Sequence, residues 1–177
     1  MKKLLLFTLL FISVTVFSQT EKNKILLSGS TNASYLFSST ESSDYKTTNI
    51  IISPAIGFFT SNNLVLGISS LYKNSKVKNN NYDSKSTSFG ISPFLRYYTP
   101  KENRNSKFFV QIEGGYMENN NISGSVISGS FGLSFFFNQH VSFDIEGVYA
   151  HTVIEDNTIN SIELDLGLSV YLGKTKE

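Results

Sequence analysis

The sequence predicts an all-β protein, a single eight-stranded antiparallel up-and-down transmembrane β-barrel. Apolar side chains recur at every second position over eight segments of the chain. Each segment has about the ten residues that a tilted strand needs to cross a bilayer. After residue 18, no apolar stretch has the length of a membrane helix and no segment keeps a helical period.

The first residues predict a secretory signal peptide. Lys2 and Lys3 precede the apolar run that starts at Leu4, and Ser18 supplies a small residue before Gln19. A positive region, an apolar region and a small-residue cleavage site in this order are typical of such a signal. We therefore interpret residues 1–18 as the signal peptide and residues 19–177 as the barrel domain. An N-terminal membrane anchor fits less well because the run is short and is interrupted by Ser and Thr.

Composition excludes several classes of protein. The chain has 15 Lys+Arg and 14 Asp+Glu, and the predicted signal removes two of the lysines, so no concentrated basic face for nucleic acid is expected. The chain contains no cysteine, which excludes a disulfide framework and a lipid-anchored lipoprotein. With 14% aromatic and 16% charged residues, the composition is ordinary for a chain whose outer surface faces lipid.

The first strand is predicted from Ile25 to Phe37, with apolar residues at most odd positions and small polar residues at most even ones. Seven further segments alternate in the same way, and their opposite faces carry Ser, Thr, Asn, Gly and most of the strand charges. The apolar positions of these segments are Ile50, Ile52, Pro54, Ile56 and Phe58; Leu64, Leu66, Ile68 and Tyr72; Phe89, Ile91, Pro93, Leu95 and Tyr97; Phe108, Val110, Ile112 and Tyr116; Ile127, Phe131, Leu133, Phe135 and Phe137; Val141, Phe143, Ile145 and Tyr149; and Ile162, Leu164, Leu166, Leu168, Val170 and Leu172.

The connections alternate between long and short. Short connections are predicted at residues 60–63, 100–106 and 138–140, and long ones at residues 38–44, 73–85, 117–122 and 151–160. Short periplasmic turns and longer outer loops are typical of outer-membrane barrels. The long segments are rich in Asn, Ser and Lys, so we expect them to be solvated outer loops, with binding of a surface ligand as the alternative.

Two prolines fall inside predicted strands, where each leaves a neighbouring carbonyl without its hydrogen-bond donor. Pro54 and Pro93 lie on the apolar face in similar contexts, Ile-Ser-Pro followed by apolar residues. We expect a local bulge or a water molecule to satisfy the backbone at both positions.

The sequence resembles the family of small bacterial outer-membrane β-barrel domain proteins, which are porin-like and eight-stranded. The resemblance covers nearly all of the chain after the signal. It rests on Ser53-Pro54-x-x-Gly57-Phe58-Phe59, Asn63-Leu64-x-Leu66-Gly67, Pro93-Phe94-x-Arg96-Tyr97-Tyr98, Gly132-Leu133-Ser134-Phe135-Phe136 and the C-terminal Asp165-x-Gly167-x-x-Val170-x-Leu172.

The C-terminal motif is similar to the signal that such proteins present to the barrel-assembly machinery. The sequence departs from the usual pattern because Leu172 stands where an aromatic residue is common and residues 173–177 extend beyond it. The resemblance implies a location in the cell outer membrane, and it implies no single activity, because members include anchors, small-solute channels and adhesins.

Strand parity places a set of charged side chains in the lumen of the predicted barrel. Arg96 lies between Leu95 and Tyr97 of the apolar face and therefore points inward with Phe94 and Tyr98. The acids predicted to face the lumen are Glu113, Asp144, Glu146, Glu163 and Asp165. Because eight strands leave an interior just wide enough for side chains, we predict an Arg96–Glu113 pair at the centre of a polar network.

Two roles follow for this network. It forms a polar plug in a protein with a structural or surface-interaction role, or it lines a narrow path for small solutes or cations; we favour the plug because eight strands rarely leave a continuous channel. A soluble lipocalin-type barrel, with an apolar interior, is a further structural alternative. The clustered charges of the polar face and the regular alternation of short and long connections favour lipid outside.

Enzymatic activity is not expected, and a lipid-modifying outer-membrane enzyme is the minor alternative. His140 and His151 lie in predicted connections, and no spacing argues for a nucleophile, base and orienting group. Paired metal-ligand spacing is also absent from the sequence, so we expect no cofactor and no metal. The expected partners are outer-membrane lipid and, during insertion, the barrel-assembly machinery; the protein is expected to be a monomer.

Overall fold

The computed structural model describes residues 20–40, 43–79, 82–100, 105–119, 122–154 and 157–173. The predicted signal peptide lies outside these residues. None of the described residues belongs to a helix long and apolar enough to cross a membrane. The strands are β1 (Ile25–Thr40), β2 (Ser43–Ser61), β3 (Leu64–Asn79), β4 (Tyr82–Tyr98), β5 (Ser106–Asn119), β6 (Ile122–Phe136), β7 (Val141–Ile154) and β8 (Asn157–Leu172).

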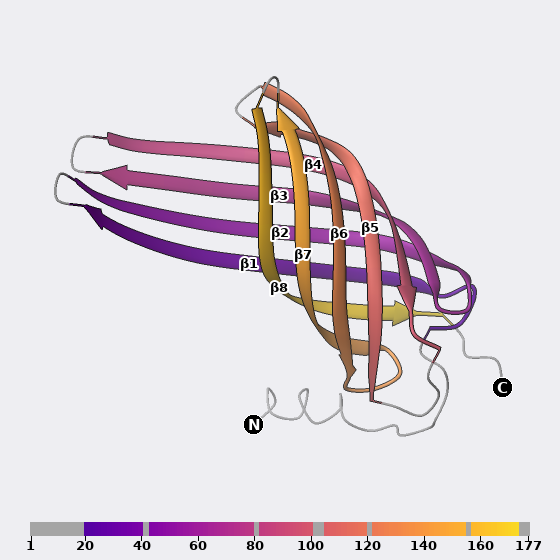
Figure 1. Cartoon of the computed structure of the whole chain (residues 1–177). Coiled ribbons are helices and arrows are strands. Elements are labelled where there is room, and N and C mark those ends of the chain that lie inside the picture. Colours follow the sequence, from indigo (N-terminus) through magenta and orange to yellow (C-terminus); the bar gives the residue numbers. More distant parts are fainter. Residues whose placement is uncertain are drawn as a thin grey trace, which may run out of the picture.

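The eight strands form one closed barrel in sequence order, and every neighbouring pair is antiparallel (Figure 1). This confirms the predicted fold class. Ile25 pairs with Phe58 on one side and with Leu172 on the other, so β1 begins and β8 ends at the same end of the barrel. We call this the terminal end, and we call the opposite end, where β1 meets β2 and β3 meets β4, the hairpin end.

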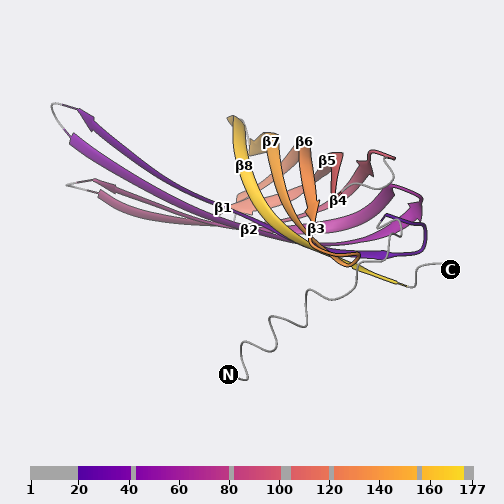
Figure 2. The same cartoon turned by 90° about the horizontal axis from the view of Figure 1, so that it is seen from below.

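The ladder around the barrel is complete only toward the terminal end. β1 and β8 pair from Ile25 and Leu172 to Thr31 and Leu166, and β4 pairs with β5 no farther toward the hairpin end than Ser88. Toward the hairpin end, β1–β4 and β5–β8 therefore diverge as two four-stranded arms (Figures 1 and 2).

The predicted long loops are wrong, because the strands continue through most of those segments. β3 and β4, for example, remain paired out to Asn79 and Tyr82, where a loop over residues 73–85 was expected. The cross-strand pair Lys76–Asp83 adds an exposed ion pair of 3.7 Å. Every residue except proline can donate and accept the main-chain hydrogen bonds of a sheet. The Asn, Ser and Lys residues of these segments therefore indicate exposure to water and not an irregular backbone. Residues 41–42, 80–81, 120–121 and 155–156 lie outside the described residues.

The short connections lie at the terminal end, close to the positions predicted for them. β2 and β3 are joined by Asn62 and Asn63, and Asn63 adopts a positive φ of 68°, which asparagine tolerates better than most residues. The register shifts by one residue between Phe59 and Ser61, so the bulge of this hairpin lies beside its turn.

The bulges expected at the two prolines are absent from the described ladders. Pro54 keeps its pairing with Gly29 of β1, and Pro93 keeps its pairing with Ile68 of β3. On the other side of each proline the ladder is interrupted and then resumes in the same register. A backbone nitrogen in a strand points to one neighbour only, so the missing N–H opens one ladder locally and leaves the other intact.

Apolar side chains on the outer face form a belt around the barrel. The belt covers residues 64–72 of β3, 108–116 of β5 and 141–149 of β7, which is nine residues in each strand. Each segment ends toward the hairpin end on an exposed tyrosine, Tyr72, Tyr116 or Tyr149. Nine residues of tilted strand match the span of a bilayer core, and tyrosines gather at its interfaces.

We predict that Ile112→Arg, in the middle of this apolar belt, lowers the free energy of unfolding by about 2–4 kcal/mol in lipid vesicles. Ile112 is 63% exposed, so the substitution disturbs no packing inside the protein and the loss comes from placing a charge in hydrocarbon. Denaturant titration measures the change. Glu118→Arg, on the same face of β5 but past Tyr116, is the control and is expected to change stability by less than 1 kcal/mol. Equal losses in the two variants contradict the belt.

Candidate functional site

The barrel lumen contains a cavity of about 300 Å³. Serine is the commonest residue of its lining, which also contains aliphatic side chains and charged groups. All six residues that parity placed in the lumen line it: Arg96, Glu113, Asp144, Glu146, Glu163 and Asp165. We call this space the lumen cavity.

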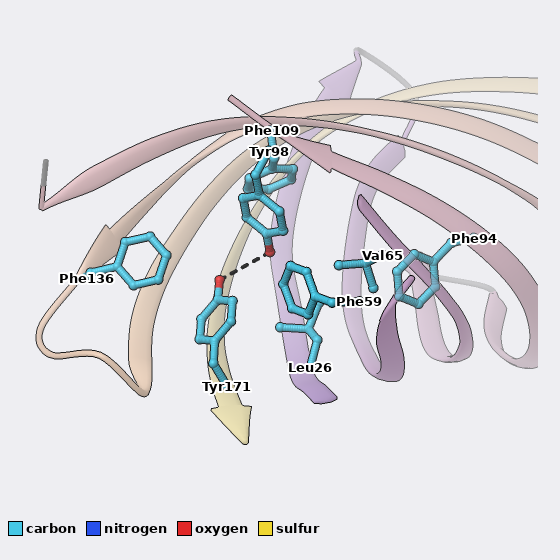
Figure 3. Packing of buried hydrophobic residues seen from close by; sticks show 8 residues of the cluster. All are labelled: Leu26, Phe59, Val65, Phe94, Tyr98, Phe109, Phe136 and Tyr171. Carbon is cyan, nitrogen blue, oxygen red and sulfur yellow. Dashed lines mark hydrogen bonds between the residues drawn. The ribbon is translucent and has the colours of Figure 1, made fainter. Parts of the chain in front are cut away.

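At the terminal end the lumen is filled by a cluster of buried apolar side chains, which we call the lumen plug (Figure 3). At its centre the hydroxyls of Tyr98 and Tyr171 are 3.2 Å apart, and Phe59 packs on both rings with centroid distances of 6.0 and 6.1 Å. None of the plug residues lines the lumen cavity, so the cavity stops above them. The plug consists of Leu26, Phe59, Val65, Phe94, Tyr98, Phe109, Phe136 and Tyr171.

Glycines give the plug rings their space. A Cβ at Gly132 would lie 2.3 Å from the ring of Phe109, and a Cβ at Gly67 would lie 2.5 Å from the ring of Phe94. Both distances are far below van der Waals contact, so any larger residue at these positions displaces an aromatic ring. The plug rings therefore need glycine at positions 67 and 132, where they pack directly against the backbone.

A layer of polar contacts lies on the terminal side of the plug. The Lys107 ammonium donates to Thr20 Oγ1 at 2.7 Å and to Asn63 Oδ1 at 3.3 Å. The backbone N–H of Asn63 also donates to the carbonyl of Thr20 at 2.8 Å, so the chain before β1 is held against the β2–β3 turn. Lys107 and Thr20 are both buried.

Arg96 joins the plug to the lumen cavity. Its guanidinium carbon lies 4.3 Å from the centre of the Phe109 ring, a cation–π contact on the plug side. Its Nε donates to Gln111 at 2.6 Å, and one terminal nitrogen donates to the hydroxyl of Tyr98 at 3.3 Å. Arg96 is 5% exposed, so a charge this deep requires the partners that it has.

The predicted ion pair between Arg96 and Glu113 is replaced by a different arrangement. Among the described residues, the ion pairs of Arg96 are with Asp144, at 3.7 Å, and with Glu146, at 3.8 Å. Gln111 lies between Arg96 and Glu113, because it accepts from Arg96 and donates to the Glu113 carboxylate at 3.2 Å. The correction has a geometric cause: β7 lies across the lumen from β4, and Arg96 is long enough to reach it.

Serine hydroxyls complete the coordination of the buried carboxylates. Asp144 accepts from Ser142 at 2.8 Å and from Ser169 at 2.6 Å, and Glu146 accepts from Ser130 at 3.2 Å. Small hydroxyl donors on neighbouring strands therefore satisfy oxygens that the single guanidinium does not reach. Asp144 belongs to the plug side of the network, because Ser142 also contacts the hydroxyl of Tyr171 at 3.3 Å.

Asp165 and Glu163 lie farther from Arg96, at successive lumen-facing positions of β8. Asp165 is 6% exposed and accepts from the Asn32 side chain of β1 at 3.0 Å. Glu163 lines the lumen cavity and is more exposed. Among the described residues, neither carboxylate lies within ion-pair distance of a basic side chain.

The two histidines lie at opposite ends of β7. His140 precedes the strand, and its Nδ1 lies 2.9 Å from the carbonyl of Tyr171. His151 is near the hairpin end, with Nδ1 2.8 Å from Asn160 Oδ1. They do not meet in one site. Within the described ranges, no group of three or more His, Cys, Asp or Glu side chains could hold a metal ion.

Sequence reasoning missed most of the plug. Phe94 and Tyr98 were expected to point inward, but Phe59, Phe109 and Phe136 were not singled out. The signal was present as aromatic doublets near the terminal end, Phe58-Phe59, Tyr97-Tyr98, Phe108-Phe109 and Phe135-Phe136. Strand parity sends one ring of each doublet to the belt and the other into the lumen.

We predict that Arg96→Met destabilises the barrel by about 3–5 kcal/mol in denaturant titrations, because it leaves Asp144 and Glu146 buried without a cation. Methionine keeps much of the side-chain volume, so the loss reports charge and not packing. The same substitution combined with Asp144→Asn and Glu146→Gln removes the unpaired charges and is expected to recover most of the stability. A single variant as stable as the unsubstituted protein contradicts the network.

The comparisons with known proteins agree with this geometry at the level of fold. No protein-family model matches the sequence, and no curated protein sequence matches it either. Among solved structures, the outer membrane protein OprG from Pseudomonas aeruginosa superposes with a TM-score of 0.58 and 12% identity, over 88% of this chain and 99% of OprG. Neisserial surface protein A superposes with a TM-score of 0.52 and 15% identity, over 83% of this chain and 96% of that protein. The chain therefore has the fold of small outer-membrane β-barrels.

Proposed function

We propose that this chain is an outer-membrane β-barrel protein with a closed lumen, whose role at the cell surface is structural and interactive. The observation that carries the closed lumen is the plug, in which eight apolar side chains fill the terminal end directly beneath the Arg96 network. The apolar belt on the outer face supports the membrane location, since most of the large apolar side chains that are exposed among the described residues lie on the outward face of the closed barrel.

The shape of the barrel supports an orientation with the terminal end in the periplasm. At that end, the Asn62-Asn63 turn follows the belt at once, whereas at the hairpin end β3 continues for seven residues past Tyr72. Outer-membrane barrels place short turns in the periplasm and longer polar segments outside. In this proposal, outer-membrane lipid surrounds the belt, the signal peptide and the barrel-assembly machinery deliver the protein, and it acts as a monomer without enzymatic activity.

The second candidate is a narrow path for small cations. One observation favours it: five carboxylates line the lumen cavity, against the basic side chains Arg96 and Lys73. A continuous path requires the plug to move, because the cavity stops at Arg96. The two candidates therefore differ in whether the plug opens.

We predict that the protein fractionates with the outer membrane and that its electrophoretic mobility changes on boiling. A closed barrel resists detergent at room temperature and migrates as a compact species, whereas heat unfolds it. Membrane fractionation followed by gels of boiled and unboiled samples measures both properties. A product recovered from the periplasm without a mobility shift contradicts the membrane location.

We predict that the protein gives no conductance in planar bilayers and that removing the plug creates it. The plug variant carries Phe59→Ala, Tyr98→Ala and Tyr171→Ala, which empties the centre of the cluster. The matched control carries Phe58→Ala, Tyr97→Ala and Leu172→Ala, at neighbouring positions that face outward. Single-channel steps in the plug variant but not in the control are the expected result. Stable conductance of the unsubstituted protein supports the cation path and overturns the closed lumen.

A further inference from the structure

We propose that the lumen cavity is a binding site for a small organic cation, an aliphatic amine of about the size of a diamine, that enters from the hairpin end. The proposal rests on the orientation proposed above, which makes the hairpin end the outer one. Charge, unpaired hydroxyls and an aliphatic wall point to this ligand class.

The charge of the lining calls for a cation. Glu113, Asp144, Glu146, Glu163 and Asp165 line the cavity with Arg96 and Lys73, which leaves an excess of three carboxylates. Arg96 is committed to Asp144 and Glu146 at the floor. The remaining acids therefore lie in the wall above a guanidinium that is already paired.

Two of the acids form a like-charge pair across neighbouring strands. Glu146 of β7 lies directly opposite Asp165 of β8, and Glu163 is the next lumen-facing residue along β8. Like charges at directly opposite positions destabilise a sheet. Glu146, at 7%, and Asp165, at 6%, are both nearly inaccessible, so solvent screens their repulsion poorly. An ammonium group placed between Glu163 and Asp165 offsets that cost.

Several nearly buried serine residues line the cavity without a hydrogen-bond partner for their hydroxyls among the described residues. Ser88, Ser92 and Ser128 are 4–6% exposed and line the cavity, and their hydroxyls form no hydrogen bond with another described residue. Buried polar groups in proteins are almost always paired. Hydroxyls aimed into a cavity beside carboxylates can accept the N–H groups of a bound amine that the carboxylates do not take.

The upper wall distinguishes an organic cation from a metal ion. Leu71, Met117, Val126, Ile154 and Ile159 line the cavity toward the hairpin end. Methylene groups of an amine bury apolar surface against these side chains, whereas a metal ion and its water shell cannot. A volume of about 300 Å³ suits a small organic molecule rather than a bare ion.

The test is calorimetric titration of the full barrel, refolded in a neutral detergent, with 1,5-diaminopentane. We expect saturable binding that weakens as the salt concentration rises. Glu163→Gln and Asp165→Asn are each expected to weaken the affinity about tenfold, the effect of losing one charge-assisted hydrogen bond. Glu118→Gln makes the same change of charge on the outer face of β5 and is the matched control, expected to leave affinity unchanged.

The neutral analogue 1,5-pentanediol and magnesium chloride complete the design. The diol is expected to show no saturable binding. Magnesium is expected to weaken diamine binding only as much as the general rise in salt concentration does. Equal binding of the diol overturns the requirement for charge, and stoichiometric competition by magnesium overturns the organic ligand. No saturable binding of the diamine, or equal weakening by Glu118→Gln, overturns the site.

The gel mobility shift of each variant verifies that the barrel is folded before titration. Glu163→Gln is not expected to disturb folding, because Glu163 forms no hydrogen bond or ion pair with another described residue. Bilayer conductance of the unsubstituted protein overturns the closed lumen but does not bear on diamine binding. Calorimetry alone decides diamine binding, so the two proposals fail independently.

Discussion

Closure of the barrel is the constraint on which the rest of the structure depends. In hydrocarbon, each backbone N–H and C=O must find its partner within the protein, so a sheet is stable there only if its first and last strands pair. That closure is the β1–β8 ladder, which joins only seven residues of each strand, from Ile25 and Leu172 to Thr31 and Leu166. The nine-residue apolar belt and this short seam occupy the terminal part of the same barrel, where the ladder is complete. Beyond it, outward positions such as Lys76 of β3 and Glu118 of β5 are polar and do not need lipid.

Closure also creates the lumen and the problem of what fills it. Eight strands leave an interior of side-chain width, so apolar and charged groups compete for the same small volume. The chain separates them along the axis: aromatic rings occupy the terminal end, Arg96 caps them with a cation–π contact to Phe109, and the carboxylates lie above. Arg96 is therefore both the lid of the plug and the floor of the cavity. A single guanidinium cannot neutralise the acids above it, and this imbalance gives the cavity its chemical character.

The prediction was strongest where the physics is local. The period of two identified all eight strands and divided each one into an apolar and a polar face, because side chains alternate whatever the partner strand is. It failed where polarity was used as a sign of irregular backbone: the segment from Lys73 to Lys85 is polar because it leaves the membrane, and it remains paired. The bulges predicted at the two prolines overestimated the disruption. Pro54 still pairs with Gly29, so the ladder on one side of the strand survives.

The sequence by itself determined the fold, the apolar and polar faces of every strand and six of the charged residues that line the lumen cavity, because these follow from alternation along one strand. Tertiary structure alone decided that Arg96 pairs with Asp144 and Glu146 and reaches Glu113 only through Gln111. It also decided that six aromatic residues from five strands, among them Phe59, Tyr98 and Tyr171, meet as one plug. The physical reason is that contacts across a lumen depend on how the closed sheet is staggered, and stagger is set by pairing between strands that no single strand encodes.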